Sequence, residues 1–262
     1  MAEKEAKLVG RRWSFCAEGY NHIIQQEFQG EIPEKWTWFL KKYAPTSKGR
    51  VLDIGTGPGF FAILFGQMGW KVTGIDCSDE MIKTAAINAA AANVDADFMQ
   101  MDNHCLQFPD NTFDYIVSRN VTWILYDPEV AFKEWLRVLK PGGRILYFDA
   151  NWPYEKDKVF LSAQKKDEEK YRDRYGEPIN TYTGDKETNE EFRKLIFFKS
   201  KWRPVWDVEH LPQYGYENIQ VIPRVNEQVY SEPKQLLYQS IPMFMVTADK
   251  PSRRGEHIDS QH

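Results

Sequence analysis

The sequence predicts an α/β fold built on a mostly parallel sheet of seven strands, with an antiparallel last strand and helices on both faces. Two observations predict this class. From Arg50 to about residue 150, short apolar strands alternate with helical segments, an order typical of right-handed βαβ units. The first of these strands runs into a glycine-rich turn and then an apolar helix. The helical segments before residue 45 and after residue 151 are expected to form a cap and an inserted lid.

The expected strands are short segments with few breakers, each bounded by turn residues. They are Arg50–Ile54, Lys71–Asp76, about Ala96–Met101, Phe113–Ser118, Arg144–Asp149, about Ile219–Ile222 and Met243–Ala248. Side-chain caps mark the helix starts: Ser78 precedes two acidic residues, and Asp127 precedes a proline. Thr188 and Glu191 have the spacing of a capping box. The helix that begins after Asp127 is expected to stop at Lys140–Gly143, which contains a proline–glycine break.

A length of 262 residues suits one such domain with additions rather than two catalytic domains. We expect five segments along the chain. They are an N-terminal helical cap (1–45), a ligand-binding core (46–151), a lid that contacts substrate (152–206), the C-terminal part of the core (207–250) and a flexible tail (251–262).

Composition argues against several classes of partner. The formal net charge is −4, whereas proteins that grip nucleic acid usually concentrate positive charge, so we expect no nucleic-acid partner. No apolar run approaches the roughly 18 residues that a membrane span requires, so we expect no contact with a membrane. The charged segment Met1–Lys7 does not resemble a signal peptide, and the three cysteines lack CxxC spacing. These features favour a cytoplasmic protein with reduced thiols. Composition leaves the oligomeric state open between monomer and dimer.

The glycine turn after the first strand is the main candidate for a ligand site. Asp53-Ile-Gly-Thr-Gly-Pro-Gly59 allows close backbone approach by a ligand at the carboxyl end of the strand. Phe60 stands where a dinucleotide fingerprint needs a third glycine, which argues against a pyrophosphate ligand. Asp76 ends the second strand and suits two ribose hydroxyls. Asp102 and Asn103 follow the third strand and suit the edge of an adenine. We therefore predict a Rossmann-like site for an adenosyl group.

Four segments together resemble the class I methyltransferases that depend on S-adenosylmethionine (SAM), most closely the group containing quinone and menaquinone C-methyltransferases. The segments are Val51–Gly59, Gly74–Met81, Phe108–Asp114 and Arg137–Gly143. The resemblance implies SAM as the cofactor and transfer of its methyl group to an acceptor. It does not extend to the Asn-Pro-Pro-Tyr motif used on adenine or glutamine amides, since the fourth strand here ends Ser118-Arg-Asn-Val-Thr-Trp123. The large charged insertion argues against a lipid quinone.

The same resemblance assigns residues to the cofactor. It implies that the glycine turn lines the methionine portion, that Asp76 holds the ribose, and that Arg119 and Asn120 face the methionine and the methyl group. Met81 would lie beside the adenine. The full set that we expect to bind the cofactor is Asp53, Gly55, Thr56, Gly57, Gly59, Asp76, Cys77, Met81, Asp102, Asn103, Arg119 and Asn120.

Catalytic groups are less evident, because methyl transfer mainly requires alignment of the acceptor and exclusion of water. A general base matters only for an acceptor that arrives protonated. The candidates are Tyr20, His22 and Asp149, and His104 could also reach the site. Each could equally be an ordinary structural or solvated residue. His104 and Cys105 lack further ligands at metal spacing, so no metal is expected.

The acceptor is expected to be a small molecule, because a cap and a lid would enclose the mouth of the site. Trp123 is a candidate wall of the substrate pocket, and Asn151 is a candidate substrate contact. Two alternatives remain: a SAM-sensing module without turnover, and a methyltransferase that acts on tRNA or protein. Acidic composition disfavours the last of these.

Overall fold

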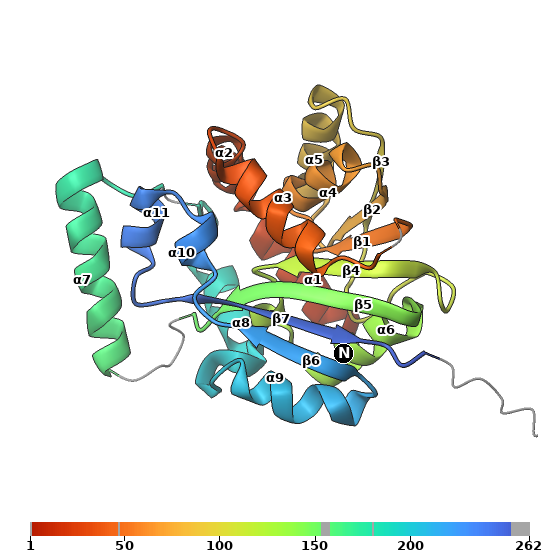
Figure 1. Ribbon diagram of the computed structural model, residues 1–262. Helices are drawn as coiled ribbons and strands as arrows, with labels where there is room; N and C mark the ends of the chain where they lie inside the picture. Colours follow the sequence, from red (N-terminus) through yellow and green to blue (C-terminus); the bar gives the residue numbers. More distant parts are fainter. Residues whose placement is uncertain (1, 47, 153–157, 180, 253–262) are drawn as a thin grey trace, which may run out of the picture.

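A computed structural model describes residues 2–46, 48–152, 158–179 and 181–252 (Figure 1). Its centre is a seven-stranded sheet in the order β3-β2-β1-β4-β5-β7-β6. The strands are β1 (Arg50–Ile54), β2 (Lys71–Asp76), β3 (Ala96–Gln100), β4 (Phe113–Arg119), β5 (Leu139–Ala150), β6 (Glu217–Ile222) and β7 (Met243–Asp249). The predicted tail lies outside the described residues from residue 253 onward.

Strand directions confirm the predicted mixed sheet. β1 pairs in parallel with β2 and β4, β3 adds to β2, and β5 adds to β4. β7 runs antiparallel to both of its neighbours, β5 and β6; Leu146 of β5 faces Thr247, and Val221 of β6 faces Val246. Because the first five strands are parallel, their carboxyl ends meet at one edge of the sheet, where open α/β sheets bind ligands.

Helices cover both faces because side chains alternate along each strand. Val51 of β1 packs into a core with α4 (Phe60–Gln67) and α3 (Ile32–Tyr43). Leu52 points to the opposite face and packs with α6 (Pro128–Val138) and α9 (Val205–His210). α5 (Asp79–Ala91) lies against β2 and β3.

The N-terminal cap consists of α1 (Ala2–Ser14), α2 (Ala17–Glu27) and α3. Trp36 anchors α3, because its ring meets the rings of Phe61 and Phe148 edge-on at 5.1 and 4.9 Å. The insertion contains α7 (Lys158–Tyr175), α8 (Lys186–Leu195) and η2 (Phe197–Ser200), and α9 begins at its end; η3 (Leu211–Tyr214) follows in the C-terminal part of the core. Before β7 come α10 (Asn226–Val229) and α11 (Glu232–Leu237), and α11 packs beside α7 (Figure 1).

Two local expectations are corrected and two are confirmed. Asp185, not Thr188, caps α8: its carboxylate accepts from the backbone N–H of Thr188 at 2.7 Å. Lys140–Gly143, predicted to be the end of α6, belongs instead to β5, which begins at Leu139 and contains a register shift before Arg144. Ser78 and Asp127 cap α5 and α6 as expected.

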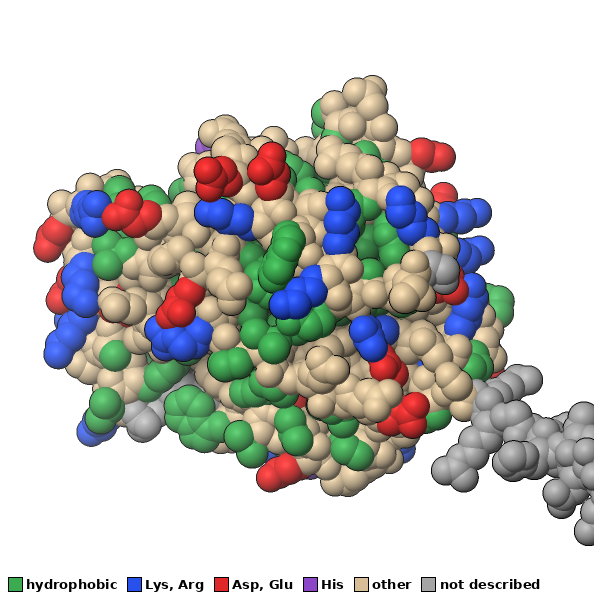
Figure 2. Space-filling model, in the orientation of Figure 1, with side chains coloured by type: hydrophobic (Ala, Val, Ile, Leu, Met, Phe, Trp, Pro, Cys, Tyr) green, Lys and Arg blue, Asp and Glu red, His purple; other side chains and the backbone are tan. Residues whose placement is uncertain are grey.

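Over the part of the chain that is described, none of the helices combines the length and apolar character needed to cross a membrane. Basic and acidic side chains are interspersed on the face of the molecule in Figure 2, with apolar side chains between them. That face therefore presents mixed charge rather than one basic surface.

Candidate functional site

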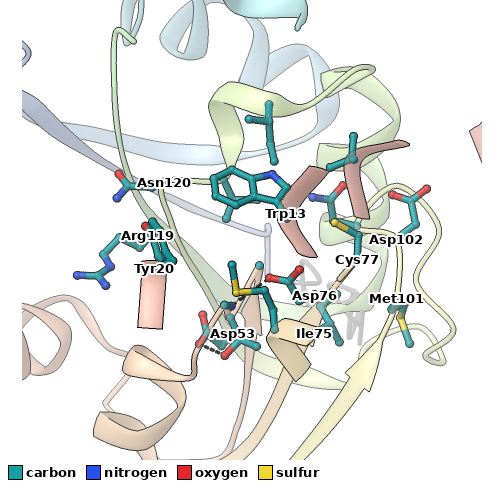
Figure 3. A pocket seen from close by; sticks show the side chains of 18 of the residues that line it. Trp13, Tyr20, Asp53, Ile75, Asp76, Cys77, Met101, Asp102, Arg119 and Asn120 are labelled. Atoms are coloured by element: carbon teal, nitrogen blue, oxygen red, sulfur yellow. Dashed lines mark hydrogen bonds between the residues drawn. The ribbon is translucent and has the colours of Figure 1, made fainter. Parts of the chain in front are cut away.

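A cavity of about 870 Å³, including its open mouth, lies at the carboxyl ends of β1, β2 and β4 (Figure 3). Residues that follow the strands form its floor, and α1 and α2 of the cap form its roof. The lining includes Asp53, Gly55, Thr56, Gly57, Asp76, Cys77, Met81, Asp102, Asn103, Arg119 and Asn120. Of the twelve expected cofactor residues, only Gly59 lies outside this lining; it occupies the N-cap of α4.

The glycine turn adopts backbone angles that side chains disfavour, with φ of 65° at Gly55 and 52° at Gly57. A Cβ at Gly55 would lie 2.2 Å from Val121, so the turn packs tightly against the segment that follows β4. A Cβ at Gly57 would have only the ring of Tyr20 within reach, at 4.0 Å, so this glycine faces open space. The turn therefore leaves room for a ligand to approach its backbone.

Asp53 holds the turn in place. One carboxylate oxygen, Oδ2, accepts from the Thr56 hydroxyl at 2.7 Å and from the backbone N–H of Ala62 at 3.0 Å. Burial raises the pKa of Asp53 to about 6, although these hydrogen bonds favour the ionised form. Asp53 thus links β1 to the turn and to α4, and one of its oxygens is committed to that role.

Asp76 lies at the centre of the cavity floor. Its carboxylate accepts from the backbone N–H groups of Gly57 at 3.1 Å and Ser78 at 2.9 Å. Burial raises its pKa to about 6, with both backbone hydrogen bonds acting in the opposite direction. Each carboxylate oxygen keeps further acceptor capacity, since a carboxylate offers about four acceptor positions.

Asp102 is more heavily engaged than its position after β3 suggests. Oδ1 accepts from the ring Nδ1 of His104 at 2.9 Å, and Oδ2 accepts from the hydroxyl of Tyr126 at 2.6 Å. Burial acts to raise the pKa of Asp102, but these hydrogen bonds outweigh burial and lower it. His104 Nε2 accepts from the backbone N–H of Asp127 at 3.3 Å, which assigns the neutral tautomer protonated at Nδ1. Both ring nitrogens of His104 therefore have partners.

Three buried polar atoms in the cavity lining have no hydrogen-bond partner among the described residues. They are Oδ1 of Asn103, Oδ1 of Asn120 and the indole Nε1 of Trp13. Asn120 also adopts a positive φ of 59°. Because buried polar groups are nearly always paired, two unpaired acceptors and one unpaired donor on residues of the same lining favour a polar ligand at this cavity.

A buried ionic group lies beside the cavity. Glu27 accepts from Arg119 Nη1 at 2.7 Å through one oxygen and from Lys234 through the other. Burial opposes ionisation, but the two cations lower the pKa of Glu27 to about 2. The Arg119 guanidinium also lies over the ring of Phe60, 4.5 Å from its centre. Arg119 is thus oriented by Glu27 while it lines the cavity.

A second, larger chamber adjoins the first and has a volume of about 1600 Å³ with its open mouth. Trp13, Tyr20, Ile24 and Asn120 line both spaces and mark the junction. The remaining lining consists of Arg12, Ile23, Glu27, Trp123, Trp152, Gln164, Thr181, Arg193, Lys199, Tyr230, Lys234 and Tyr238. The cap, the insertion and the segment before β7 therefore enclose this chamber together.

The candidates for catalysis and substrate binding occupy different places. Tyr20 lies at the junction, and burial raises the pKa of its hydroxyl. Trp123 lines the second chamber. His22 is exposed on α2 and lies outside the lining of both spaces. Asp149 and Asn151 also lie outside both linings.

Asp149 and Asn151 join the insertion to the sheet. Asp149 Oδ2 accepts from the Thr122 hydroxyl at 2.6 Å and lies 3.5 Å from the Arg203 guanidinium. Asn151 exchanges two hydrogen bonds with the backbone of Arg203, at 2.7 and 2.9 Å. Arg203 is also paired with the buried Asp207. These contacts hold the insertion beside the end of β5.

Sequence reasoning missed Glu27, Lys234, Arg12 and Tyr126 as site residues. Glu27 had a local signal: it lies three and seven residues beyond Ile24 and Tyr20, which places all three on one face of α2. The other three had no comparable signal, because long-range contacts bring them to the site. Among the described residues, no cluster of three His, Cys, Asp or Glu side chains could hold a metal ion.

Comparison with known proteins gives a consistent result. The profile of a methyltransferase domain matches residues 52–147. A putative methyltransferase of Bacillus subtilis, YqeM, is 32% identical over 151 residues, covering 56% of this chain and 60% of the relative. The ubiquinone/menaquinone biosynthesis C-methyltransferase UbiE of Shewanella halifaxensis is 32% identical over 163 residues, covering 58% and 62%. The chain thus matches about three fifths of each relative's length.

Solved structures share the fold. A putative methyltransferase of Bacillus halodurans superposes with a TM-score of 0.56 at 20% identity, covering 82% of this chain and 99% of that one. Phosphoethanolamine N-methyltransferase 2 of Haemonchus contortus, solved with SAM, gives 0.53 at 20% identity, covering 84% and 52%. At these identities the likeness concerns the fold.

Proposed function

We propose that this chain is a class I SAM-dependent methyltransferase and that it transfers the methyl group of SAM to a small acceptor molecule. The match of residues 52–147 to a methyltransferase domain and the two relatives that are 32% identical support this proposal. The observation that carries this proposal is the pair of adjoining spaces. The first has the acidic and amide groups that an adenosyl ligand requires, and the second has room for an acceptor. They meet at Tyr20 and Asn120.

The lining of the first cavity fits SAM. Asp76 retains acceptor capacity for the ribose hydroxyls, and Oδ1 of Asn103 is an unpaired acceptor for the adenine amino group. Gly57 leaves space beside the turn, and Oδ1 of Asn120 is an unpaired acceptor near the second chamber. Cys77 and Met81 supply apolar contact for the base. The other expected cofactor residues that line this cavity are Asp53, Gly55, Thr56, Asp102 and Arg119.

When bound, SAM supplies an electrophilic methyl group: its bond to sulfur breaks, sulfur keeps the electron pair, and the acceptor atom bonds to the methyl carbon. The protein's part is to align the acceptor with the methyl and to exclude water. Tyr20 and Asn120 orient the acceptor at the junction. Because burial raises the pKa of Tyr20, its hydroxyl stays protonated at neutral pH and serves as a hydrogen-bond donor.

The second chamber is lined by the cap, the insertion and the segment before β7, and this supports a small acceptor that lies in line with the methyl group of SAM. The cap (1–45) and the insertion (152–206) act as the specificity elements around the core segments 46–151 and 207–250. The mixed charge on the face shown in Figure 2, together with the net charge of −4, supports a partner other than nucleic acid. Three free cysteines support a cytoplasmic location.

Cofactor binding is tested by isothermal titration with S-adenosylhomocysteine (SAH) for the wild type, Asp76→Ala and the control Asp97→Ala. Asp97 is an exposed carboxylate on β3, one strand away. We expect a loss of about tenfold or more in affinity for Asp76→Ala, since its carboxylate makes charge-assisted hydrogen bonds, and no change for the control. Unchanged affinity in Asp76→Ala would mean that the ligand binds elsewhere.

Turnover is tested by incubating cell extract with SAM that carries a deuterated methyl group and searching for labelled small molecules by mass spectrometry. The expected result is at least one labelled metabolite that Asp76→Ala fails to produce. Tight SAH binding without any labelled product would favour a sensor module instead. Label found in RNA or protein rather than in metabolites would favour a macromolecular acceptor.

A further inference from the structure

Arg12 is a buried cation without an acidic partner. Its side chain lines the second chamber, and the residue is only 8% exposed. Among the described residues, no carboxylate lies within ion-pair distance of it. Its single side-chain hydrogen bond goes from Nη1 to the sulfur of Cys16 at 2.8 Å, and its Nε is buried without a partner.

Neighbouring groups compensate this charge only in part. The guanidinium lies over the rings of Trp13, Tyr182 and Phe192, 4.7 to 5.0 Å from their centres. Such contacts attract a cation but do not replace the hydrogen bonds that a guanidinium makes in water. Burial raises the pKa of the Cys16 thiol despite the nearby Arg12, so the thiol is neutral. The protein thus holds a fixed positive charge with unused donors at this chamber.

Other charges around the chamber do not cancel this one. Glu27 is the sole carboxylate among the described lining residues, and Arg119 and Lys234 already occupy both of its oxygens. Arg12 therefore remains available to an anionic group in this chamber.

We propose that the acceptor is a small anion with a flat, apolar body, and that Arg12 binds its carboxylate or phosphate group. This inference rests on the proposed function, because it assigns the second chamber to the acceptor. A guanidinium matches carboxylate and phosphate with two parallel hydrogen bonds. Trp123, Trp152 and Tyr238 line the same chamber and supply ring faces for a planar body.

The carboxylate of the cofactor's methionine is the competing ligand for Arg12. It is disfavoured because Arg12 lines the second chamber and not the cavity above Asp76. The two possibilities differ in a measurable way. An acceptor anchor leaves SAH affinity unchanged when it is removed, whereas a cofactor anchor does not.

The test measures binding of matched probes to SAH-saturated protein by titration calorimetry. The probes are 4-hydroxybenzoate, 4-hydroxyphenyl phosphate, the neutral 4-hydroxybenzamide and the cationic 4-hydroxybenzylamine. The variants are Arg12→Met, which keeps length without charge, Arg12→Lys, which keeps the charge, and the control Arg11→Met. Arg11 is the adjacent residue on α1, exposed and paired with Asp185. Thermal unfolding of each variant verifies that it folds.

We expect the wild type and Arg11→Met to bind at least one anion about tenfold more tightly than the amide. Arg12→Met should lose this preference while its SAH affinity stays within about twofold, and Arg12→Lys should restore part of it. Equal binding of all probes, absence of anion binding, or an unchanged preference in Arg12→Met overturns the proposal. A drop in SAH affinity in Arg12→Met assigns Arg12 to the cofactor and also overturns it. Failure of the wild type to bind SAH would instead refute the proposed function.

Discussion

Glu27 joins the cap to the rest of the site, and its replacement by Gln should be costly. Glu27 on α2 bridges Arg119 at the end of β4 and Lys234 on α11, so one carboxylate connects three distant parts of the chain. The side chains of Glu27 and Arg119 are each 8% exposed. Glu27→Gln preserves shape, but its amide oxygen can accept from one cation only, and its NH₂ group then faces the other.

Two independent considerations give the size of the effect. Removing one partner of a buried ion pair costs about 3–5 kcal/mol, because the remaining charge is left uncompensated. The pKa of Glu27 falls from 4.5 to about 2, which corresponds to about 3 kcal/mol of preference for the ionised form. Both give about 3 kcal/mol at pH 7. For a chain of this size that is a fall of roughly 6–12 °C in Tm.

The assay is urea unfolding followed by circular dichroism, with Glu18→Gln as control, since Glu18 is exposed on the same helix. The pH dependence follows from the lowered folded-state pKa of Glu27. Its stabilisation is present above about pH 4.5 and is lost as the pH falls towards 2. The gap between wild type and Glu27→Gln should therefore shrink by about 1.4 kcal/mol per pH unit over that window. A gap below 1 kcal/mol at pH 7, or one that does not change with pH, would refute this reasoning.

Three further outcomes are expected. Gly55→Ala should weaken SAH binding about tenfold or more and lower Tm, because the added Cβ would collide with Val121. Gly30→Ala has a similar φ of 63° but nothing within 4 Å of the added Cβ, so it should show only the backbone cost of about 1 kcal/mol. Equal effects of the two variants in calorimetry and thermal melts would contradict the packing argument. SAH affinity should decline as the pH falls through about 6, because protonation removes the carboxylate form of Asp76. The decline should be smaller in Asp76→Asn, where only Asp53 still titrates near pH 6; a flat wild-type profile from pH 7.5 to 5 counts against this prediction. Arg203→Met should lower the free energy of unfolding by about 3–5 kcal/mol, because it leaves the buried carboxylates of Asp149 and Asp207 without their cation. The control Arg224→Met, whose side chain is exposed and paired with Glu227 on the surface, should change it by close to zero. Equal urea midpoints for the two variants would exclude a structural role for the Arg203 cluster.

Local patterns in the sequence were sufficient for the sheet and for the floor of the first cavity. The glycine turn and the acid that ends β2 are set by spacing along one βαβ unit, so Gly55 and Asp76 could be placed before the fold was known. The caps Ser78 and Asp127 depend on hydrogen bonds within three residues. The extra length of β5 was missed because Pro–Gly–Gly normally ends an element, whereas here it lies within a register shift.

Roles that depend on distant partners could not be read from the sequence. Asn151 and Asp149 were expected near the substrate because they end a parallel strand, but Arg203, about fifty residues later, engages both. Asp102 was expected to be available to adenine, yet Tyr126 occupies one of its oxygens. In each case the local position was read correctly, and the partner came from a segment without a periodic pattern.

The position of β7 also has a consequence for how this protein is made. Residues 243–249 are translated after every other strand, yet they lie between β5 and β6 in the finished sheet. Until they emerge from the ribosome, β6 has no neighbour in the described sheet, and β5 keeps an open side. Pairs such as Ile145 with Ala248 close loops of about a hundred residues, and such distant contacts form slowly. Nascent chains should therefore pass through a stage with two unpaired strand edges, when association with other chains is most favoured.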